Sequence, residues 1–222
     1  MSERPAYTRL LLIRHGEASG NRELRYLGTT DAPLTASGEE QARRLAEALR
    51  DAPMRALYCS PLLRARGTAA ALLAAEAPEI EQRLCEQDYG AWEGLTSAEA
   101  RARDPQLYAE WERGLVDAPP QGESFAQLRT RSVACADALA QRHAGEVIAL
   151  VSHVGPIKAI ICATLGLPIM ASRHMWLNPA SICIVDWSLS AVHVEMDKPA
   201  GILRLFNGGP DLATLALAQM LW

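Results

Sequence analysis

The 222-residue sequence predicts an α/β fold, a three-layer α/β/α sandwich around a mostly parallel sheet. Two observations lead to this prediction. Short apolar segments recur along the chain with room for a helix between them, which is typical of parallel strands joined by crossover helices. One stretch, residues 85–125, interrupts this alternation without a strand of its own, so we expect it to form a small, mainly helical cap. Residues 1–222 are otherwise expected to form a single domain.

The individual elements are predicted from hydrophobic pattern and capping residues. Strands are expected at residues 9–13, 56–59, 146–152, 182–187 and 202–206, which are short apolar segments. Helices are expected at residues 35–50, 63–75, 124–143 and 157–165, where apolar residues recur at helical spacing or follow a strand end. Thr96 and Ser124 each begin a capping-box pattern, with Glu99 and Gln127 three residues later.

The C-terminal segment, residues 211–222, is predicted to be a helix that is apolar on nearly every side. Gly208, Gly209 and Pro210 break the preceding strand, and Asp211 can cap the helix. Such a helix is rarely left in water. We expect it to dock on its own core, with docking on a second subunit in a homodimer as the alternative.

Composition narrows the partners and the compartment. The formal net charge of −4 argues against a large nucleic-acid interface. The most apolar stretch, residues 147–170, contains His153 and Lys158 and is not expected to span a membrane. There is no signal-peptide pattern at the N-terminus, and the five cysteines are widely spaced without a CxxC pair. These features predict a cytoplasmic protein with reduced, buried thiols.

Polar residues follow three of the predicted strands at the point where each ends. Arg14 and His15 follow the first strand, Ser60 and then Arg64 follow the second, and His153 follows the strand at residues 146–152. Because the carboxyl ends of parallel strands meet at one edge of a sheet, we expect these side chains to lie together.

This combination of residue types fits phosphoryl chemistry. Two arginines can clamp a phosphoryl group with bidentate hydrogen bonds. A neutral imidazole can attack phosphorus, and a second, protonated histidine can neutralise the phosphoryl oxygens. The reaction also needs a carboxylic acid to protonate the leaving oxygen, a role that Glu86 could fill from its irregular segment.

Taken in order, the motifs resemble those of the histidine phosphatase superfamily. Residues 12–17 read Leu-Ile-Arg-His-Gly-Glu, and the later segments that carry the resemblance are residues 28–38, 58–65, 84–96 and 151–155. The resemblance implies that His15 accepts the phosphoryl group and that Glu86 is the general acid and base. It also implies that phosphate is bound by Arg14, Arg64, His153 and Asn21. Val154 stands where family members usually have glycine, so some adjustment of the backbone is expected there.

Within that family we expect a metal-independent phosphomonoester hydrolase acting on a small phosphorylated metabolite. The chain is short between the acid segment and the second histidine, as in the small broad-specificity and ribazole-type phosphatases, whereas mutases carry a longer insertion. Phosphoryl transfer of the phosphoglycerate mutase type is one alternative. A catalytically silent protein that binds a phosphorylated ligand on the same fold is the other.

No metal or cofactor is expected. The five histidines give no ligand-spaced pair, and the sequence contains no Asp-x-Asp triplet and no Walker A loop. Arg22, Arg25 and Tyr26 follow the first motif and are candidates for binding the rest of the substrate, for example a second anionic group. The alternative is that the two arginines are simply solvated.

Overall fold

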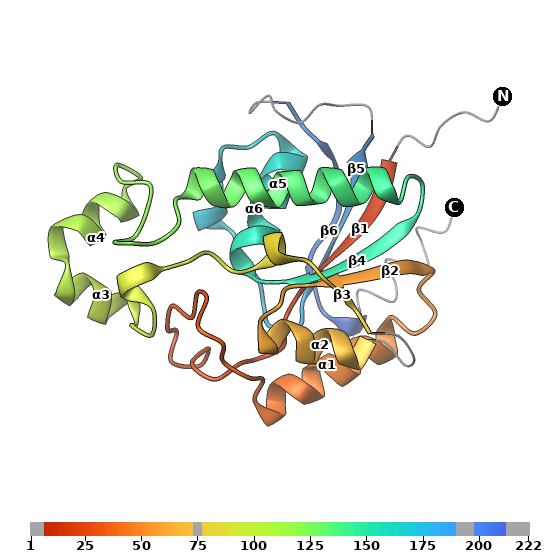
Figure 1. Cartoon of the computed structure of the whole chain (residues 1–222), viewed down its shortest axis with the longest axis horizontal. Coiled ribbons are helices and arrows are strands. Elements are labelled where there is room, and N and C mark those ends of the chain that lie inside the picture. The colour runs from red at the N-terminus through yellow and green to blue at the C-terminus, as the bar shows by residue number, and fades with distance from the viewer. Residues whose placement is uncertain (1–6, 73–76, 190–197, 212–222) are drawn as a thin grey trace.

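The computed structural model describes residues 7–72, 77–189 and 198–211, which are built around one six-stranded sheet (Figure 1). The order across the sheet is β3-β2-β4-β1-β5-β6. The strands are β1 (Tyr7–Arg14), β2 (Met54–Cys59), β3 (Glu79–Ile80), β4 (Val147–Ser152), β5 (Ile182–Ser188) and β6 (Gly201–Gly208). Only β5 runs against the other described strands, because β1 pairs with β4 in parallel and with β5 in antiparallel fashion. The mostly parallel sheet is therefore confirmed.

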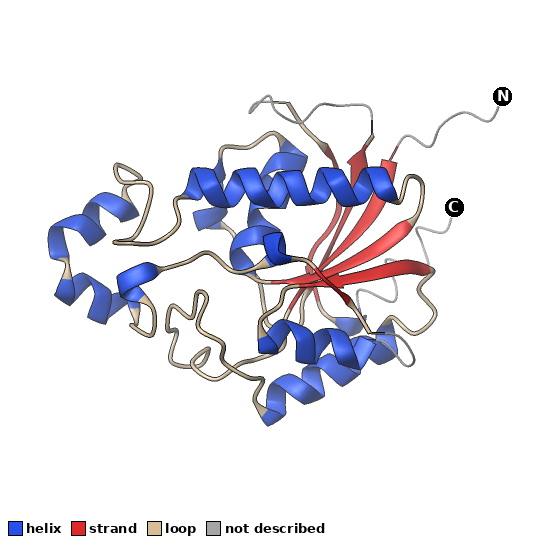
Figure 2. Cartoon of the chain, viewed as in Figure 1, coloured by secondary structure: helices blue, strands red, loops and turns tan. Residues whose placement is uncertain are grey.

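Helices cover both faces of this sheet (Figures 1 and 2). The α-helices are α1 (Ala36–Ala48), α2 (Leu63–Leu72), α3 (Ser97–Arg103), α4 (Pro105–Glu112), α5 (Phe125–Arg142) and α6 (Val154–Leu165). The alternation of side chains along β1 builds the two cores: Leu10 and Leu12 join the cluster with α5 and α6, whereas Leu11 and Ile13 join the cluster with α1. This is the predicted three-layer sandwich.

The caps that the sequence predicts are present. The side chain of Thr35 accepts a hydrogen bond from the N–H of Gly38, and complete capping boxes begin α3 at Thr96 and α5 at Ser124. One boundary was wrong. Helix α6 begins at Val154 and not at residue 157, so it starts directly after the strand-end histidine.

Residues 85–125 form the helical insertion that the sequence predicts. They contain α3, α4 and a 3₁₀ turn at Gly90–Trp92 but no strand. In Figure 1, α3 and α4 lie beyond the end of α5, to one side of the sheet. The aromatic side chains of the insertion, Trp92, Tyr108, Trp111 and Phe125, form a hydrophobic cluster that also includes Leu128 of α5 and Ala159 of α6. The insertion therefore has its own packing, which fixes the segment that carries Glu86.

One strand was not predicted from the sequence, and one predicted helix lies outside the described residues. Strand β3 was missed, because two exposed residues give no periodic pattern. The predicted C-terminal helix lies outside the described residues beyond Asp211. None of the helices in the described ranges has the length and hydropathy that crossing a bilayer requires.

Candidate active site

His15 lies immediately after β1 and is almost completely buried, with 3% of its surface exposed. Its Nδ1 lies 2.7 Å from the carbonyl oxygen of Gly16. A carbonyl can only accept a hydrogen bond, so this contact assigns the ring proton to Nδ1. The lone pair of a neutral His15 is then on Nε2, which has no hydrogen-bond partner within the described ranges. Nε2 is thus the atom able to attack an electrophile.

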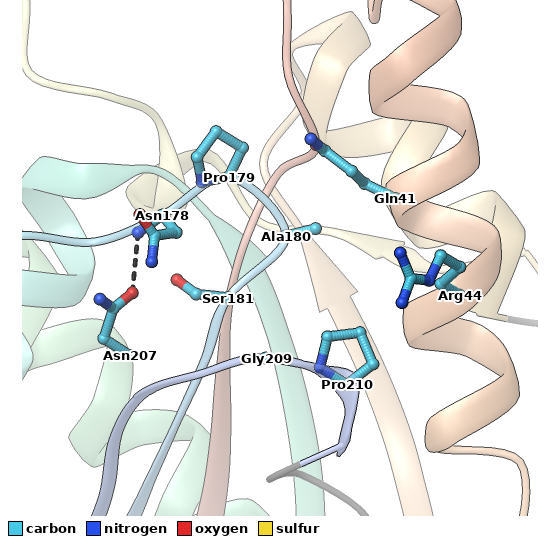
Figure 3. Close-up of a pocket in the computed structure, with 9 residues that line it drawn as sticks. All are labelled: Gln41, Arg44, Asn178, Pro179, Ala180, Ser181, Asn207, Gly209 and Pro210. Carbon is cyan, nitrogen blue, oxygen red and sulfur yellow. Dashed lines mark hydrogen bonds between the residues drawn. The ribbon is translucent and has the colours of Figure 1, made fainter.

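A loop before β5, residues 178–181, is hydrogen-bonded to the backbone of Arg14 and His15. Figure 3 shows this loop beside Asn207. The N–H of Ala180 donates to the carbonyl oxygen of His15, and the N–H of Arg14 donates to that of Ser181, both at 3.0 Å. The loop is fixed in turn by Asn207, whose side-chain oxygen accepts from the N–H of Asn178 at 2.7 Å. We assigned no role to this segment from the sequence, because its contribution is made through backbone atoms.

His153 and Arg64 stand beside His15 as one hydrogen-bonded unit. The two imidazole rings have centroids 5.0 Å apart. Arg64 Nε donates to His153 Nδ1 at 3.2 Å, so Nδ1 is an acceptor and the proton of a neutral His153 is on Nε2, 2.8 Å from Ser60 Oγ. Arg64 is 1% exposed, and the pair is held rigidly against the nucleophile.

The guanidinium of Arg64 is aimed by the loop at residues 28–30. It donates to the carbonyl oxygens of Gly28 and Thr30, both at 2.7 Å. The carboxylate of Glu93 fixes that loop by accepting from the N–H and hydroxyl groups of Thr29 and Thr30, at 2.6–3.0 Å. Gly28 has φ +51°, and a Cβ there would lie 2.0 Å from Glu93 Oε1, so this close approach requires glycine. Glu93 is a positioning residue that we did not single out from the sequence.

Arg64 is buried and Arg14 is half-buried, and neither makes an ion pair with a carboxylate among the described residues. Arg14 donates to the carbonyl oxygen of Leu177, and its Nε is buried without a hydrogen-bond partner. Burial lowers the pKa of Arg14 to about 10, against the opposing charge of Glu86 and with a smaller contribution from Arg64, and burial also lowers the pKa of Arg64. Two guanidinium groups without an ion pair, beside a nucleophile, favour the binding of an anion there.

The same environment keeps both histidines neutral in the unliganded site. Burial and then the charges of Arg14 and Arg64 lower the pKa of His15 well below 6.5. Burial and the neighbouring His15 do the same to His153. A neutral His15 suits nucleophilic attack. The sequence led us to expect a protonated His153, but the lowered pKa favours neutral His153 before an anion binds.

This pKa lowering predicts a specific loss of stability in mild acid. Between the lowered native pKa values and 6.5, the unfolded chain binds protons that the native histidines do not. The free energy of unfolding should therefore fall as the pH drops below about 6.5, by up to about 1.4 kcal/mol per pH unit for each histidine. Urea unfolding in phosphate-free buffer at about pH 7.5 and 5.5 measures the slope. In the His153→Asn variant, the free energy of unfolding should depend less steeply on pH, because one of the two histidines no longer contributes. An unchanged slope in that variant would contradict the explanation.

Glu86 faces the cavity with one carboxyl oxygen held and the other available. Oε1 accepts from the backbone N–H of Gln87 at 2.8 Å and of Gly155 at 2.9 Å, whereas Oε2 has no hydrogen-bond partner in the part of the chain that is described. A Cβ at position 155 would lie 2.4 Å from Oε1, so glycine is needed there. Val154 is the first residue of α6, where a β-branched side chain is compatible with the backbone. The backbone at Val154 is that of a helix, so the structure shows no special adjustment for the β-branched side chain.

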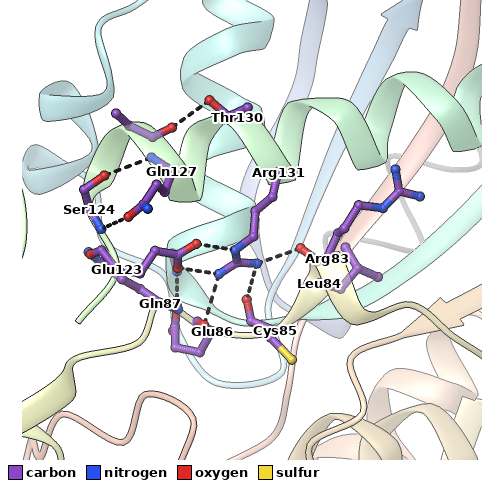
Figure 4. Close-up of polar contacts among 12 residues, drawn as sticks. Arg83, Leu84, Cys85, Glu86, Gln87, Glu123, Ser124, Gln127, Thr130 and Arg131 are labelled. Carbon is purple, nitrogen blue, oxygen red and sulfur yellow. Dashed lines mark hydrogen bonds and ion pairs between the residues drawn. The ribbon is translucent and has the colours of Figure 1, made fainter. Parts of the chain in front are cut away.

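Arg131 on α5 holds the segment that carries Glu86 (Figure 4). Its guanidinium donates to the carbonyl oxygens of Arg83, Cys85 and Glu86 at 2.7–3.0 Å. An ion pair of 2.6 Å with Glu123 fixes the guanidinium itself. Nothing in the local sequence of α5 indicates this role, because the three acceptors are more than forty residues away along the chain.

These groups surround a cavity of about 250 Å³. The predicted residues that line it are Arg14, His15, Asn21, Arg25, Tyr26, Arg64 and Glu86, whereas His153 is fully buried next to His15 and is not part of the lining. Asn21 uses its side-chain oxygen to accept from the N–H of Ala18 at 2.8 Å, which leaves its amide nitrogen to act as a donor. In the described ranges, no three His, Cys, Asp or Glu side chains are grouped as ligands for a metal ion.

The structure places Arg22 outside the lining of the cavity, so its substrate-binding role stays a prediction. Arg22 does not line the cavity, its side chain is 71% exposed, and it pairs with Glu17 at 3.0 Å. Arg25 lines the cavity but is engaged with Glu99 at 2.9 Å and with the carbonyl oxygen of Gly94. The hydroxyl of Tyr26 lies 3.0 Å from that of Tyr108. Of the three residues predicted just after the motif, Arg25 and Tyr26 therefore line the cavity, and Arg22 does not.

Comparison with known proteins places this site in a family. Residues 10–196 match the family model of the histidine phosphatase superfamily (branch 1). Phosphoserine phosphatase 1 of Hydrogenobacter thermophilus is 32% identical over 89% of this chain and 91% of its own length. A probable phosphoglycerate mutase GpmB of Enterobacter sp. is 35% identical over 83% of this chain and 90% of its own length.

A solved structure agrees with these sequence relatives. The structure of a putative α-ribazole-5′-P phosphatase from Escherichia coli K-12 superimposes with a TM-score of 0.77 at 28% identity, covering 91% of this chain and 97% of that one. Mycobacterial relatives are 36% identical to this chain, which spans 50% of their length. Because the family model covers most of the chain and the fold agrees, the chain belongs to the histidine phosphatase superfamily.

Proposed function

We propose that this chain is a metal-independent phosphomonoester hydrolase that works through a phosphohistidine on His15. One observation carries the proposal: a buried, neutral His15 with a free Nε2 lines the same cavity as Arg14 and Arg64, two guanidinium groups that make no ion pair with a carboxylate within the described ranges. Such an arrangement suits a dianionic phosphoryl group next to a nucleophile. The cavity of about 250 Å³ suits a small phosphorylated metabolite.

The first half of the proposed reaction transfers the phosphoryl group to the protein. His15 Nε2 attacks phosphorus while Arg14 and Arg64 bind the phosphoryl oxygens. The bond from phosphorus to the ester oxygen breaks, and that oxygen takes a proton from the carboxyl group of Glu86. Asn21 contributes its amide N–H group, and His153 holds the Arg64 guanidinium in position by accepting the hydrogen bond from its Nε.

The second half returns the protein to its starting state. The Glu86 carboxylate takes a proton from a water molecule, whose oxygen attacks the phosphohistidine phosphorus. The phosphorus–nitrogen bond breaks, inorganic phosphate leaves, and Glu86 is again protonated. A substrate hydroxyl in place of water would give phosphoryl transfer of the mutase type. The relative named a probable phosphoglycerate mutase supports that reaction as the alternative.

Turnover of p-nitrophenyl phosphate in excess EDTA tests the proposal. We expect the rate to be the same with and without the chelator. The positive charge that neutralises the phosphoryl oxygens comes from Arg14 and Arg64, so no metal ion is needed for this role. A rate that disappears in EDTA and returns with a divalent cation would contradict metal independence. If the protein turns over no phosphomonoester but transfers phosphate between phosphoglycerates, the mutase alternative is supported. Binding of phosphorylated ligands without either reaction would favour the catalytically silent protein.

A further inference from the structure

A second pocket lies between α1 and the loop at residues 178–181 (Figure 3). Its volume is about 130 Å³, roughly half that of the active cavity, and no described residue lines both. The loop separates the two: Leu177 lines the active cavity, whereas Asn178 lines the second pocket. The described lining of the second pocket includes no aspartate and no glutamate. Its chemistry is therefore set by neutral polar groups and one arginine.

Each of the three side-chain amides in this pocket has its oxygen engaged and its nitrogen free. The side-chain oxygen of Gln41 accepts a hydrogen bond from the N–H of Glu17 at 2.8 Å. That of Asn178 accepts from the indole N–H of Trp176 at 2.9 Å, and that of Asn207 accepts from the N–H of Asn178 at 2.7 Å. Because a backbone or indole N–H can only donate, these contacts fix the orientation of each amide. The three NH₂ groups have no hydrogen-bond partner within the described ranges, so the pocket mainly offers donors.

Arg44 and Ser181 extend this set of donors. Arg44 is exposed, faces the loop from α1 in Figure 3, and makes neither an ion pair nor a hydrogen bond in the parts of the chain that are described. Ser181 is 3% exposed, and its Oγ is buried without a hydrogen-bond partner. Figure 3 shows this hydroxyl pointing toward the side chains of Asn178 and Asn207. A buried hydroxyl without a partner is unfavourable, so a ligand with several acceptor oxygens would be bound favourably there.

We infer that this pocket binds a small tetrahedral oxyanion, inorganic phosphate or sulfate, at a site separate from the active cavity. The oxygens of such an ion match a guanidinium, amide NH₂ groups and a hydroxyl that converge on one small space without a carboxylate. The N–H of Ala180, in the same loop, donates to the carbonyl oxygen of His15 at 3.0 Å. An oxyanion held between α1 and this loop therefore braces the backbone of His15. The inference does not depend on the proposed function.

Nuclear magnetic resonance of the isotope-labelled full chain, titrated with sodium sulfate, tests the site directly. The side-chain NH₂ signals of Gln41, Asn178 and Asn207 should shift and saturate with a Kd of about 1 mM or below, and sodium chloride at equal ionic strength should give no saturable shift. Arg44→Met should weaken this binding by about 10- to 100-fold, the usual worth of a charge-assisted hydrogen bond. Arg43→Met is the matched control, because it removes the neighbouring cation of α1, which pairs with Glu40 and does not line the pocket.

The hydroxyl of Ser181 gives a second, independent variant. Ser181→Ala should weaken sulfate binding at these signals by about 2- to 10-fold, the worth of a neutral hydrogen bond. Its free energy of unfolding without sulfate should be unchanged or higher, because the hydroxyl has no partner to lose. Unchanged sulfate affinity in Ser181→Ala, or a lower free energy of unfolding, would show that the hydroxyl serves the fold and not the ligand.

The signals also distinguish this site from the active cavity. Sulfate that shifts only signals of the active cavity, such as the Nε–H of Arg64, would overturn the inference and leave the proposed function standing. Equal affinity in wild type and Arg44→Met, equal weakening in Arg43→Met, or equal shifts with chloride would overturn it as well, since each would show only a general response to charge. Absence of p-nitrophenyl phosphate turnover would contradict the proposed function without changing what is expected of the Gln41, Asn178 and Asn207 signals.

Discussion

Replacement of His15 by alanine is expected to lower kcat for phosphomonoester hydrolysis by at least about 10⁴-fold. The variant keeps Arg14 and Arg64 and so can still bind phosphate, but it has no atom that can form the covalent intermediate. His15 Nε2 is the free lone pair beside these arginines, since Nδ1 is engaged with the carbonyl oxygen of Gly16. The loss should therefore appear in kcat, with a much smaller change in KM.

The intermediate itself gives a second measurement. Rapid acid-free quenching of the wild type with labelled substrate should trap a phosphoenzyme that is labile in acid and stable in alkali, as expected for a phosphoramidate. His15→Ala should give none. His174→Ala is the matched control, because His174 is exposed and does not line the cavity. Label that persists in His15→Ala, or activity that remains within about a hundredfold of wild type, would show that another residue is the nucleophile.

The positions of Arg14, His15 and His153 could be predicted from the sequence, because each lies at the carboxyl end of a predicted strand. Arg14 ends β1, and His15 and His153 directly follow β1 and β4, which pair in parallel, so these side chains meet at one edge of the sheet. The helices were also predictable, because capping residues such as Thr96 and Ser124 act through hydrogen bonds within four residues. These features depend on local sequence or on a regular sheet.

The groups that support the centre could not be predicted in this way. Arg131 reaches the segment of Glu86 from a helix that starts 39 residues later, and Glu93 acts on a loop more than sixty residues before it. Lys158 was mentioned only as a polar interruption of an apolar stretch, although the first turns of α6 bring it into the cavity. Arg22 shows that closeness in sequence does not decide the matter. It lies seven residues after His15, but it pairs with Glu17 and does not line the cavity.

Replacement of Glu86 by glutamine is expected to have the second-largest effect, and one that depends on the leaving group. Glutamine keeps an oxygen that can accept from the N–H groups of Gln87 and Gly155, but it cannot carry the proton. Hydrolysis of an alkyl ester such as glycerol 3-phosphate should fall by about 10²–10⁴-fold, because the departing alkoxide needs that proton. Transfer from p-nitrophenyl phosphate to His15 should fall far less, because its leaving group departs without protonation.

The second half-reaction, hydrolysis of the phosphohistidine, should also be affected in the Glu86→Gln variant, and this gives a burst that can be measured. Without the Glu86 carboxylate no base activates water, so Glu86→Gln should release about one p-nitrophenol per active site in a burst and then stall as phosphohistidine. Glu79→Gln is the matched control, because that carboxylate is exposed and pairs with Arg142 away from the cavity. Equal losses on alkyl and p-nitrophenyl esters without a burst would show that Glu86 only shapes the site. The burst would instead assign proton transfer in both half-reactions to the same carboxyl group, which Gly155 and Arg131 hold in place.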